Sequence, residues 1–232
     1  RSSDRKTQAH PRVLNTFGLP AGKDASCPGA TSFCEARCYA LAIQRRFRAV
    51  EPMLAGNLAC LKEANGARGM TVLLSAMLDE FERDCETRGV AKVFRWHWDG
   101  DVFSLPYARA IAAAMRAHPE VKGWIYTRST FAVSTLLGLE NLAVYFSVDA
   151  DNVSKAARLQ GSDRLRFAFT APTWEQAAGL AAEIGERPGP KCPELTGALG
   201  LEGACVACGL CIEGRANVRF ATDKGTRKGA SA

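Results

Sequence analysis

The sequence lacks the long apolar run that a membrane-spanning helix requires. No stretch approaches about 18 consecutive apolar residues, and the first residues, RSSDRKTQAHPR, contain no apolar signal segment. We therefore expect a cytoplasmic protein with no membrane partner. The chain begins at Arg1 rather than at a methionine, so a preceding segment stays open.

Extremes of composition are absent as well. The chain is 47% hydrophobic and 23% charged, which excludes the disordered, collagen-like and fibrous classes. Its 232 residues are enough to bury a core within one large domain. We therefore expect one folded unit.

The charge is only weakly biased. The formal net charge is +6, and part of the excess lies in residues 1–12 and 221–232, which we interpret as solvated basic tails. Binding to nucleic acid would need a basic stripe on one face, which a sequence alone does not show. The charge therefore leaves the function open.

Four short segments rich in aromatic and β-branched residues alternate with amphipathic helical patterns. The predicted strands are 93–98, 123–127, 142–148 and 164–170. The predicted helices are 104–117, 129–138, 152–160 and 173–185, the last of which opens with a capping box from Thr173 to Gln176. This alternation predicts an α/β fold with a parallel sheet, either a partial TIM-like barrel or an open doubly wound sheet.

The flanking regions have weaker patterns. Residues 13–22 could form a first strand, residues 70–87 have helical periodicity, and Pro52 should divide the helical pattern of 36–64 into two helices. After residue 185, glycine or proline recurs every few positions. We therefore predict an α/β domain with an N-terminal cysteine loop at 13–185 and a cysteine-rich segment at 186–220.

Nine cysteines are spread unevenly along the chain. Their odd number, in a chain too long to depend on disulfides, argues against a disulfide framework. Cys60 and Cys85 fall at core-facing positions of helical patterns, so we interpret both as small hydrophobic residues. The other seven lie in two short windows.

The C-terminal set consists of Cys192, Cys205, Cys208 and Cys211, spaced C-x12-C-x2-C-x2-C. Bacterial ferredoxins use the close triplet to ligate clusters, so the spacing favours a [4Fe-4S] cluster. Structural zinc is the alternative, although zinc sites more often use two separated C-x2-C pairs, and free or redox-active thiols also remain open. Because residues 185–215 have few periodic apolar positions, we expect a metal centre to hold them together.

The N-terminal set consists of Cys27, Cys34 and Cys38, spaced C-x6-C-x3-C. Cys34 and Cys38 lie four apart at the predicted start of a helix, and Cys27 lies in the preceding loop, so the three thiolates can converge. A cubane held by three cysteines leaves one iron open to a substrate or cofactor. Two alternatives remain, namely a single cluster shared with one C-terminal cysteine, or a place in a helix core for Cys34 and Cys38.

Polar residues follow the predicted strands, at the edge where parallel βα folds carry their sites. The candidates are His97, Trp98, Asp99 and Asp101, then Thr127 and Arg128, then Ser147, Asp149 and Asp151, then Thr170 and Trp174. The candidate catalytic residues among them are Asp99, Asp101, His97, Arg128 and Asp149. Each alone has a simpler interpretation as a turn aspartate, a satisfied core histidine or, for Trp96 and Trp98, a packing residue. Only their convergence would indicate a site.

Several motifs together resemble a known family. They are the LPAG-x4-CPGA-x3-C-x3-CYA opening, WHWDGDVFS, WIYTRS and the closing C-x2-C-x2-C, within residues 15–212. The chain resembles a cysteine-rich family encoded by actinobacteriophages and described as iron-sulfur proteins of unassigned function. The resemblance implies a protein of the host cell cytoplasm.

The order of a cysteine triplet, a helix and a strand ending in an acidic glycine motif is also similar to radical S-adenosylmethionine enzymes. There, a three-cysteine [4Fe-4S] cluster follows the first strand of a partial barrel, and a Gly-Gly-Glu segment binds the methionyl amine. The resemblance implies that Asp99, Gly100 and Asp101, with Ser147, contact S-adenosylmethionine. Those enzymes usually have C-x3-C-x2-C, which differs from the spacing here.

Two classes of function follow. The first is an iron-sulfur enzyme of radical S-adenosylmethionine type, acting on a small molecule or a macromolecule that the sequence does not identify. The second is a non-catalytic iron-sulfur or zinc module whose basic tails contact nucleic acid or a protein partner. Cleavage of S-adenosylmethionine would separate the two.

Overall fold

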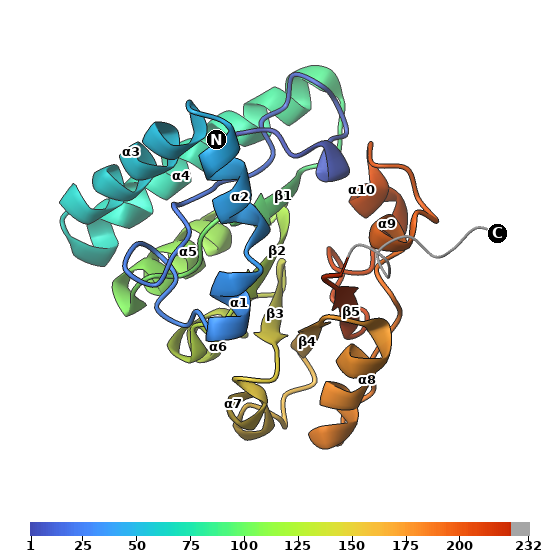
Figure 1. Ribbon diagram of the computed structural model, residues 1–232. Coiled ribbons are helices and arrows are strands. Elements are labelled where there is room, and N and C mark those ends of the chain that lie inside the picture. The colour runs from blue at the N-terminus through green and yellow to red at the C-terminus, as the bar shows by residue number, and fades with distance from the viewer. Residues whose placement is uncertain (224–232) are drawn as a thin grey trace.

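A computed structural model describes residues 1–223, and a five-stranded parallel sheet organises them (Figure 1). The strands are β1 (Val93–Trp96), β2 (Lys122–Thr127), β3 (Leu142–Val148), β4 (Leu165–Ala171) and β5 (Val218–Ala221), in that spatial order. Each neighbouring pair is parallel, and the sheet curves into a half-barrel. The predicted βα alternation is confirmed, in its partial-barrel form.

Helices cover the outer face of this sheet. They are α4 (Gly66–Arg88), α5 (Leu105–Ala117), α6 (Thr130–Leu136), α7 (Val153–Arg158) and α8 (Trp174–Glu183), of which the last begins with the predicted capping box. The main core lies between these helices and the sheet. There the ring of Phe81 on α4 lies 5.1 Å from that of Phe94 on β1.

The strands alternate between this core and the inner, concave face. Phe94 and Trp96 are fully buried against the helices, whereas Arg95 between them faces the other side. On the concave face a smaller apolar group forms around Tyr145, Ala168 and Val218. The side chains of this inner face therefore determine what the half-barrel can hold.

Before α4 the chain forms three shorter helices, α1 (Ser32–Ala36), α2 (Tyr39–Arg46) and α3 (Val50–Glu63). The two predicted pieces in 36–64 are present, but the break lies at 47–49. Pro52 occupies the first turn of α3, where a missing N–H breaks no helical hydrogen bond. The predicted helix at 70–87 is α4, which begins earlier and ends at the left-handed Gly89.

The predicted first strand at 13–22 does not form a named strand. Thr16 makes one parallel bridge to Arg95, supported by bonds from Arg95 N to Asn15 O and from Phe17 N to Arg95 O, at 3.0 and 3.3 Å. Pro20, which has no N–H, and Gly22, at φ 117°, turn the chain away soon afterwards. The segment therefore runs beside β1 without extending the sheet.

Residues 1–12 are not the solvated tail that we expected. Arg1 pairs with Asp84 at 2.9 Å, and Asp4, just before the 3-10 helix η1 (Arg5–Thr7), pairs with Arg95 at 2.6 Å. Thr7 is buried. Partners far along the chain anchor the segment, which local composition could not reveal. Most of the second predicted tail, residues 224–232, lies outside the described residues.

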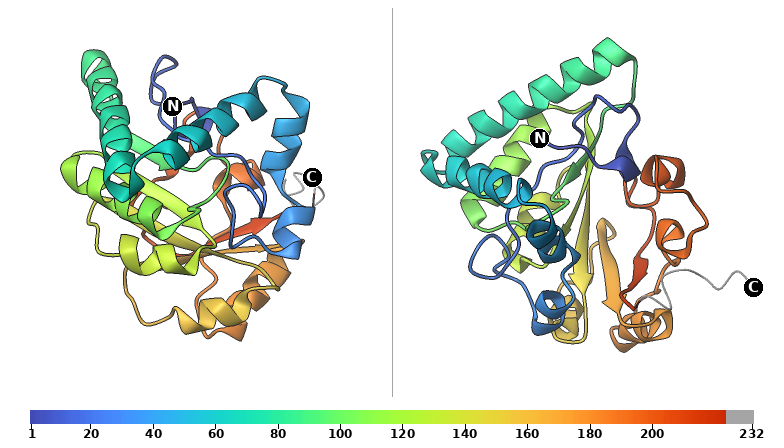
Figure 2. Two further views of the ribbon diagram at one scale, coloured as in Figure 1. Left: turned by 90° about the vertical axis from the view of Figure 1, so that its left-hand side faces the viewer. Right: turned by 45° about the horizontal axis from the view of Figure 1, so that its top comes forward.

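The cysteine-rich segment crosses the open side of the half-barrel, opposite α4 and α5 (Figure 2). It contains two short helices, α9 (Pro193–Thr196) and α10 (Ala204–Cys208), and returns to the sheet as β5, which the sequence analysis missed. Among residues 1–223, no helix is both long and apolar enough to cross a membrane.

Candidate functional site: a cysteine-lined cavity

The concave face carries a cavity of about 710 Å³. Its wall includes all seven cysteines of the two sets, Cys27, Cys34, Cys38, Cys192, Cys205, Cys208 and Cys211, and none of them forms a disulfide. The two sets come from opposite ends of the chain, about 150 residues apart in the sequence. The fold thus brings both predicted ligand sets to one site.

The C-terminal set is arranged by short helices and glycine turns. Cys192 is the N-cap of α9, Cys205 and Cys208 belong to α10, and Cys211 follows in the next turn. Gly203 and Gly209 flank α10, both at φ 67°, a conformation that favours glycine. The thiols are close enough for their charges to interact, Cys205 with Cys192 and Cys211, and Cys211 with Cys208.

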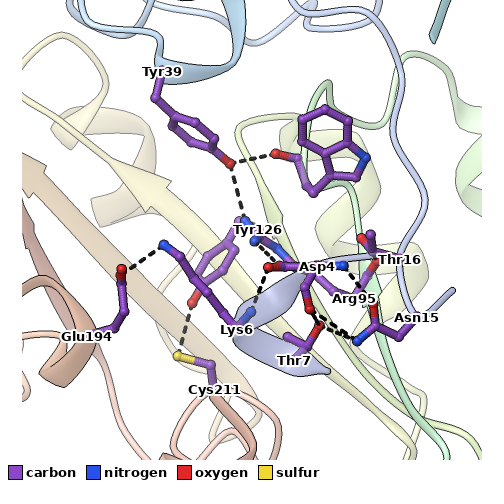
Figure 3. Close-up of polar contacts among 11 residues, drawn as sticks. Asp4, Lys6, Thr7, Asn15, Thr16, Tyr39, Arg95, Tyr126, Glu194 and Cys211 are labelled. Atoms are coloured by element: carbon purple, nitrogen blue, oxygen red, sulfur yellow. Dashed lines mark hydrogen bonds and ion pairs between the residues drawn. The ribbon is translucent and has the colours of Figure 1, made fainter. Parts of the chain in front are cut away.

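Two tyrosines from neighbouring strands attach this set to the sheet. The Tyr126 hydroxyl on β2 donates a hydrogen bond to Cys211 Sγ at 3.0 Å (Figure 3). The Tyr145 hydroxyl on β3 lies 3.2 Å from the carbonyl oxygen of Leu210 and 3.0 Å from that of Ala216. These contacts hold the turn around Cys211 against the inner face.

Burial opposes ionisation of these thiols. It raises the pKa of Cys205 to about 12 and that of Cys211 to about 11, with neighbouring thiols adding to both effects. Thiolates crowded into an apolar site need a bound cation to offset their charge. The donor set is therefore chemically suited to a metal centre.

The N-terminal set lies at the rim of the sheet. Cys34 belongs to α1 and Cys38 is the N-cap of α2, with the chain bending at Arg37, so the expected common helix start is wrong. Neither Cys34 nor Cys38 is fully buried, which argues against a helix core. Burial, with a contribution from Asp101, raises the pKa of Cys27 to about 12.

A polar network fixes this loop to the strand ends. Thr31 Oγ1 donates to Asp149 Oδ2 at 2.8 Å, and Arg128 pairs with the same oxygen at 3.1 Å. The Phe33 N–H donates to Asp151 Oδ2 at 2.8 Å. The loop of the N-terminal cysteines therefore lies at the carboxyl ends of β2 and β3.

The predicted carboxylates differ in whether an oxygen remains free to accept a hydrogen bond. Asp101 accepts from the backbone N–H of Val102 at 2.6 Å and of Arg128 at 2.8 Å, one on each oxygen. Both Asp149 oxygens are likewise occupied, since Oδ1 accepts from the Asp151 N–H. These two carboxylates already serve the fold, which was not foreseen.

Asp99 has an oxygen to spare. Its Oδ2 accepts from Gln44 Nε2 at 2.8 Å, while Oδ1 is buried and has no partner. Burial raises the pKa of Asp99 to about 6. A carboxylate in this state gains from a ligand that donates a hydrogen bond.

The strand end around Asp99 is unusual in two further ways. Within residues 1–223, the buried side-chain nitrogens and oxygens without a partner belong to Arg95, His97, Trp98 and Asp99, which all line the cavity. His97 is also the one non-glycine residue of that range with a positive φ, 58°. Unsatisfied groups and backbone strain at one strand end are typical of a ligand site.

His97 itself is a buried, neutral side chain. Its Nε2 lies 2.8 Å from the Tyr107 hydroxyl, and its Nδ1 is unpartnered. Burial and the nearby Arg95 charge lower its pKa to about 3. A role as a proton-carrying acid near neutral pH is therefore disfavoured.

The remaining candidates divide between the cavity and the core. Trp98, Gly100, Thr127, Ser147 and Thr170 line the cavity. Trp96 and Trp174 are buried elsewhere. Gly100, at φ 78°, packs so closely that an added Cβ would lie 2.5 Å from Ser26 Oγ. The structure thus brings most strand-end candidates to the cavity, whereas their individual roles stay predictions.

Several residues of the cavity wall were not predicted from the sequence. Arg95 pairs with Asp4 at 2.6 Å and bonds to the Tyr39 hydroxyl at 3.3 Å, so it lies between the N-terminal segment and the start of α2 (Figure 3). Tyr126 and Tyr145 were also missed. Alternation along the strands could have identified all three, because they share the face opposite the core residues.

The two cysteines outside the sets behave differently. Cys85 is 1% exposed, as predicted, whereas Cys60 is exposed, so its predicted core position is wrong. The buried face of α3 is formed by Leu54, Leu58 and Leu61. Cys60 precedes Leu61 by one position and therefore points about 100° away from that face.

The spacing of the thiols bears on a single-metal site. Within the described part of the chain, the one group of three possible ligand atoms lying within 4.8 Å of one another is Asp79, Glu82 and His118, outside the cavity. Four thiolates around one zinc would lie about 3.8 Å apart, given Zn–S bonds near 2.3 Å. Among residues 1–223, no three cysteine thiols are therefore as close together as a single zinc ion requires.

Comparison with known proteins places the chain in a family. Residues 1–214 match the family model described as "Gene product 88". The "Gene 88 protein" of Mycobacterium phage L5 is 39% identical over 97% of this chain and 98% of its own length, and that of Mycobacterium phage D29 is 38% identical over the same shares. No solved structure matches. The expected resemblance to an actinobacteriophage family is confirmed, and the chain belongs to the Gene product 88 family.

Proposed function

We propose that this chain is an iron-sulfur protein with two cysteine-held centres in one cavity. Cys192, Cys205, Cys208 and Cys211 hold one [4Fe-4S] cluster, and Cys27, Cys34 and Cys38 hold a second with one iron left for a ligand. The observation that carries the proposal is the convergence of seven free cysteines on one 710 Å³ cavity. Among residues 1–223, no three thiols lie within 4.8 Å of one another, which supports iron over zinc.

The ligand proposed for the open iron carries both an amine and a carboxylate, as S-adenosylmethionine does. A reduced cluster would supply the electron that cleaves such a sulfonium. The unpartnered Oδ1 of Asp99 supports an amine at this place, because Asp101, the other acidic residue of the motif, is already hydrogen-bonded within the chain. Because Gly100 has no Cβ, the backbone at this position can pack directly against the Ser26 hydroxyl.

The chain's own residues would position this ligand. Asp99 would accept a hydrogen bond from the ammonium, and the indole of Trp98 and the hydroxyl of Ser147 line the same cavity. The Arg128–Asp149 pair would keep the cysteine loop at the rim. His97, with its lowered pKa, would offer Nδ1 as a neutral hydrogen-bonding group.

The first experiment measures the metal. The protein is purified without oxygen, and iron, sulfide and zinc are quantified for wild type, Cys208→Ser, Cys34→Ser and the matched control Cys60→Ser. We expect close to eight irons in wild type, about half in each cavity variant and no loss in Cys60→Ser. Zinc without iron or sulfide would refute the proposal.

The second experiment tests the ligand. Reduced protein with a proven cluster is mixed with S-adenosylmethionine, and 5′-deoxyadenosine and the cluster EPR signal are measured. We expect both product and a changed signal in wild type, and neither in Cys34→Ser. If wild type gives neither, the protein is a non-catalytic iron-sulfur module, and binding to a nucleic acid or protein partner in the host cytoplasm becomes the favoured function.

A further inference from the structure

We propose that Tyr126 is a positioning residue that sets the reduction potential of the cluster held by the C-terminal cysteines. This inference rests on the proposed function. Its basis is the hydrogen bond from the Tyr126 hydroxyl to Cys211 Sγ, at 3.0 Å. Figure 3 shows the hydroxyl pointing from the strand toward the sulfur.

The position of this hydroxyl is fixed by packing. The Tyr126 ring lies 5.3 Å from the ring of Tyr145 and 5.9 Å from that of Phe220, between neighbours on β3 and β5. Within residues 1–223, Cys211 Sγ is the one hydrogen-bond partner of the hydroxyl. Packing already orients the Tyr126 hydroxyl toward the sulfur, so the side chain loses little conformational entropy in making this hydrogen bond.

The effect on a cluster follows from charge. One-electron reduction adds negative charge that is shared with the cysteine sulfurs, so a hydrogen-bond donor stabilises the reduced form more than the oxidised form. The Arg95 charge acts on Cys205 and Cys211 in the same direction. Among the side-chain hydrogen bonds of residues 1–223, the short one donated to a sulfur of this set comes from Tyr126, whereas Cys192 receives backbone N–H groups from Glu194 and Leu195.

Tyr145 provides a matched control. It is a buried tyrosine on the next strand, its ring contacts Tyr126, and its hydroxyl lies 3.2 Å from the carbonyl oxygen of Leu210 and 3.0 Å from that of Ala216. The same hydroxyl also interacts with Cys211, although its two short contacts are to the carbonyl oxygens. Tyr145→Phe therefore removes a hydroxyl beside the same turn with a smaller expected effect on the cluster, and a larger shift in Tyr126→Phe would isolate the short bond to Cys211.

The experiment compares Tyr126→Phe with Tyr145→Phe in a Cys34→Ser background, so that the C-terminal cluster is observed alone. Iron and sulfide are quantified first, and the potential is then measured by redox titration with EPR detection, using dithionite as reductant. We expect unchanged iron and an about tenfold lower equilibrium constant for reduction in Tyr126→Phe, about 59 mV for a one-electron couple. Tyr145→Phe should shift the potential by much less, because the short hydrogen bonds of its hydroxyl are to carbonyl oxygens.

The outcomes are distinguishable. Absence of iron in the parent protein would refute the proposed function, whereas full iron with equal potentials in both variants would overturn only the role of Tyr126. Loss of iron from Tyr126→Phe alone would also overturn it, because the hydroxyl would then be a structural anchor. A spectroscopic check uses pulsed EPR, which should detect an exchangeable proton that is coupled to the reduced cluster in the parent protein and is missing in Tyr126→Phe. The absence of that proton would contradict the inference.

Discussion

The two cysteine sets line the same cavity but are held in different ways. The N-terminal set lies in a loop fixed by a polar network of Thr31, Arg128 and Asp149, whose carboxylate is fully buried. The C-terminal set lies in a segment whose short helices bury almost nothing, since α9 has no buried residue and α10 has only Ala204. Contacts within the chain therefore account for the order of the first set, whereas the proposed bound centre would supply order to the second.

This difference has a chemical consequence. A rigid three-cysteine site at the strand ends keeps its shape while a ligand enters and leaves, which suits reactivity. A four-cysteine site within an irregular segment adds order to the chain, as structural metal centres do. The number of cysteines in each set and the way the chain holds that set would thus both agree with a reactive N-terminal site and a structural C-terminal site.

The largest expected effect tests the dependence on metal. Cys208→Ser should make residues 186–217 a prime target for limited proteolysis, because little apolar burial remains to order them. Cys34→Ser should leave the same segment protected, and the N-terminal loop should stay resistant as well. Fragments identified by mass spectrometry after a short digest give the readout.

The control is wild-type protein stripped of metal by a chelator under anaerobic conditions. It should be cleaved at the same sites as Cys208→Ser. If the stripped protein and both variants resist protease equally, the C-terminal segment is ordered without metal, and the contrast between the two sets is wrong.

The next effect tests the polar frame of the N-terminal set. Arg128→Ala leaves the Asp149 carboxylate, which is 0% exposed, without its cation, so the free energy of unfolding should fall by about 3 to 4 kcal/mol. Urea denaturation of the metal-free protein measures it. Arg164→Ala serves as the control, because Arg164 is exposed and its contact to Glu140 is 3.9 Å.

That control should change the stability by less than about 0.5 kcal/mol. If Arg128→Ala lowers the free energy of unfolding by less than about 1 kcal/mol, the loss is smaller than that expected when a buried ion pair is broken. It would mean that this ion pair contributes little to fixing the loop of the N-terminal set, and the contrast between the two sets would be weaker.

The sequence was sufficient to predict the parts of the fold that local patterns determine. Strands from β1 to β4 and the helices between them follow from periodicity. The start of α8 is also recognisable in the sequence, because Thr173 begins its capping box. The last strand was missed because VRFA is short and follows a glycine-rich stretch, so that only its parallel pairing with β4 identifies it. The packing of residues 1–12 was missed because the Asp4–Arg95 pair joins positions far apart in the sequence.

The cysteines of the cavity could be found from the sequence, but their surroundings could not. Spacing grouped the seven cysteines into two sets, and both sets line the cavity. The spacing could not show that Asp101 and Asp149 are occupied by backbone N–H groups and Arg128, leaving Asp99 with a free oxygen. Hydrogen bonds of that kind depend on three-dimensional distances that no linear pattern contains.

The smallest effect tests Asp99, which lies beside the N-terminal set and has no full set of partners. Its folded pKa, about 6, is above the ordinary value of 3.8. The folded protein therefore holds this proton more tightly than the unfolded chain does, so the contribution of Asp99 to stability is present below pH 3.8 and is lost as the pH rises through 6. In metal-free protein, Asp99→Asn should remove this loss.

The expected result is that Asp99→Asn is about 2 kcal/mol more stable than wild type at pH 7.5 and nearly equal to it at pH 4, because a neutral amide carries no charge to bury. Urea denaturation at several pH values measures the difference, and taking it between variants cancels the opposite contribution of His97, whose folded pKa is lowered. Asp24→Asn, at an exposed position, should track wild type throughout. If Asp99→Asn instead destabilises the protein equally at both pH values, the carboxylate is satisfied in the folded chain. In that case the N-terminal set would have no free acidic oxygen beside it, and an amine-bearing ligand would lose its main support.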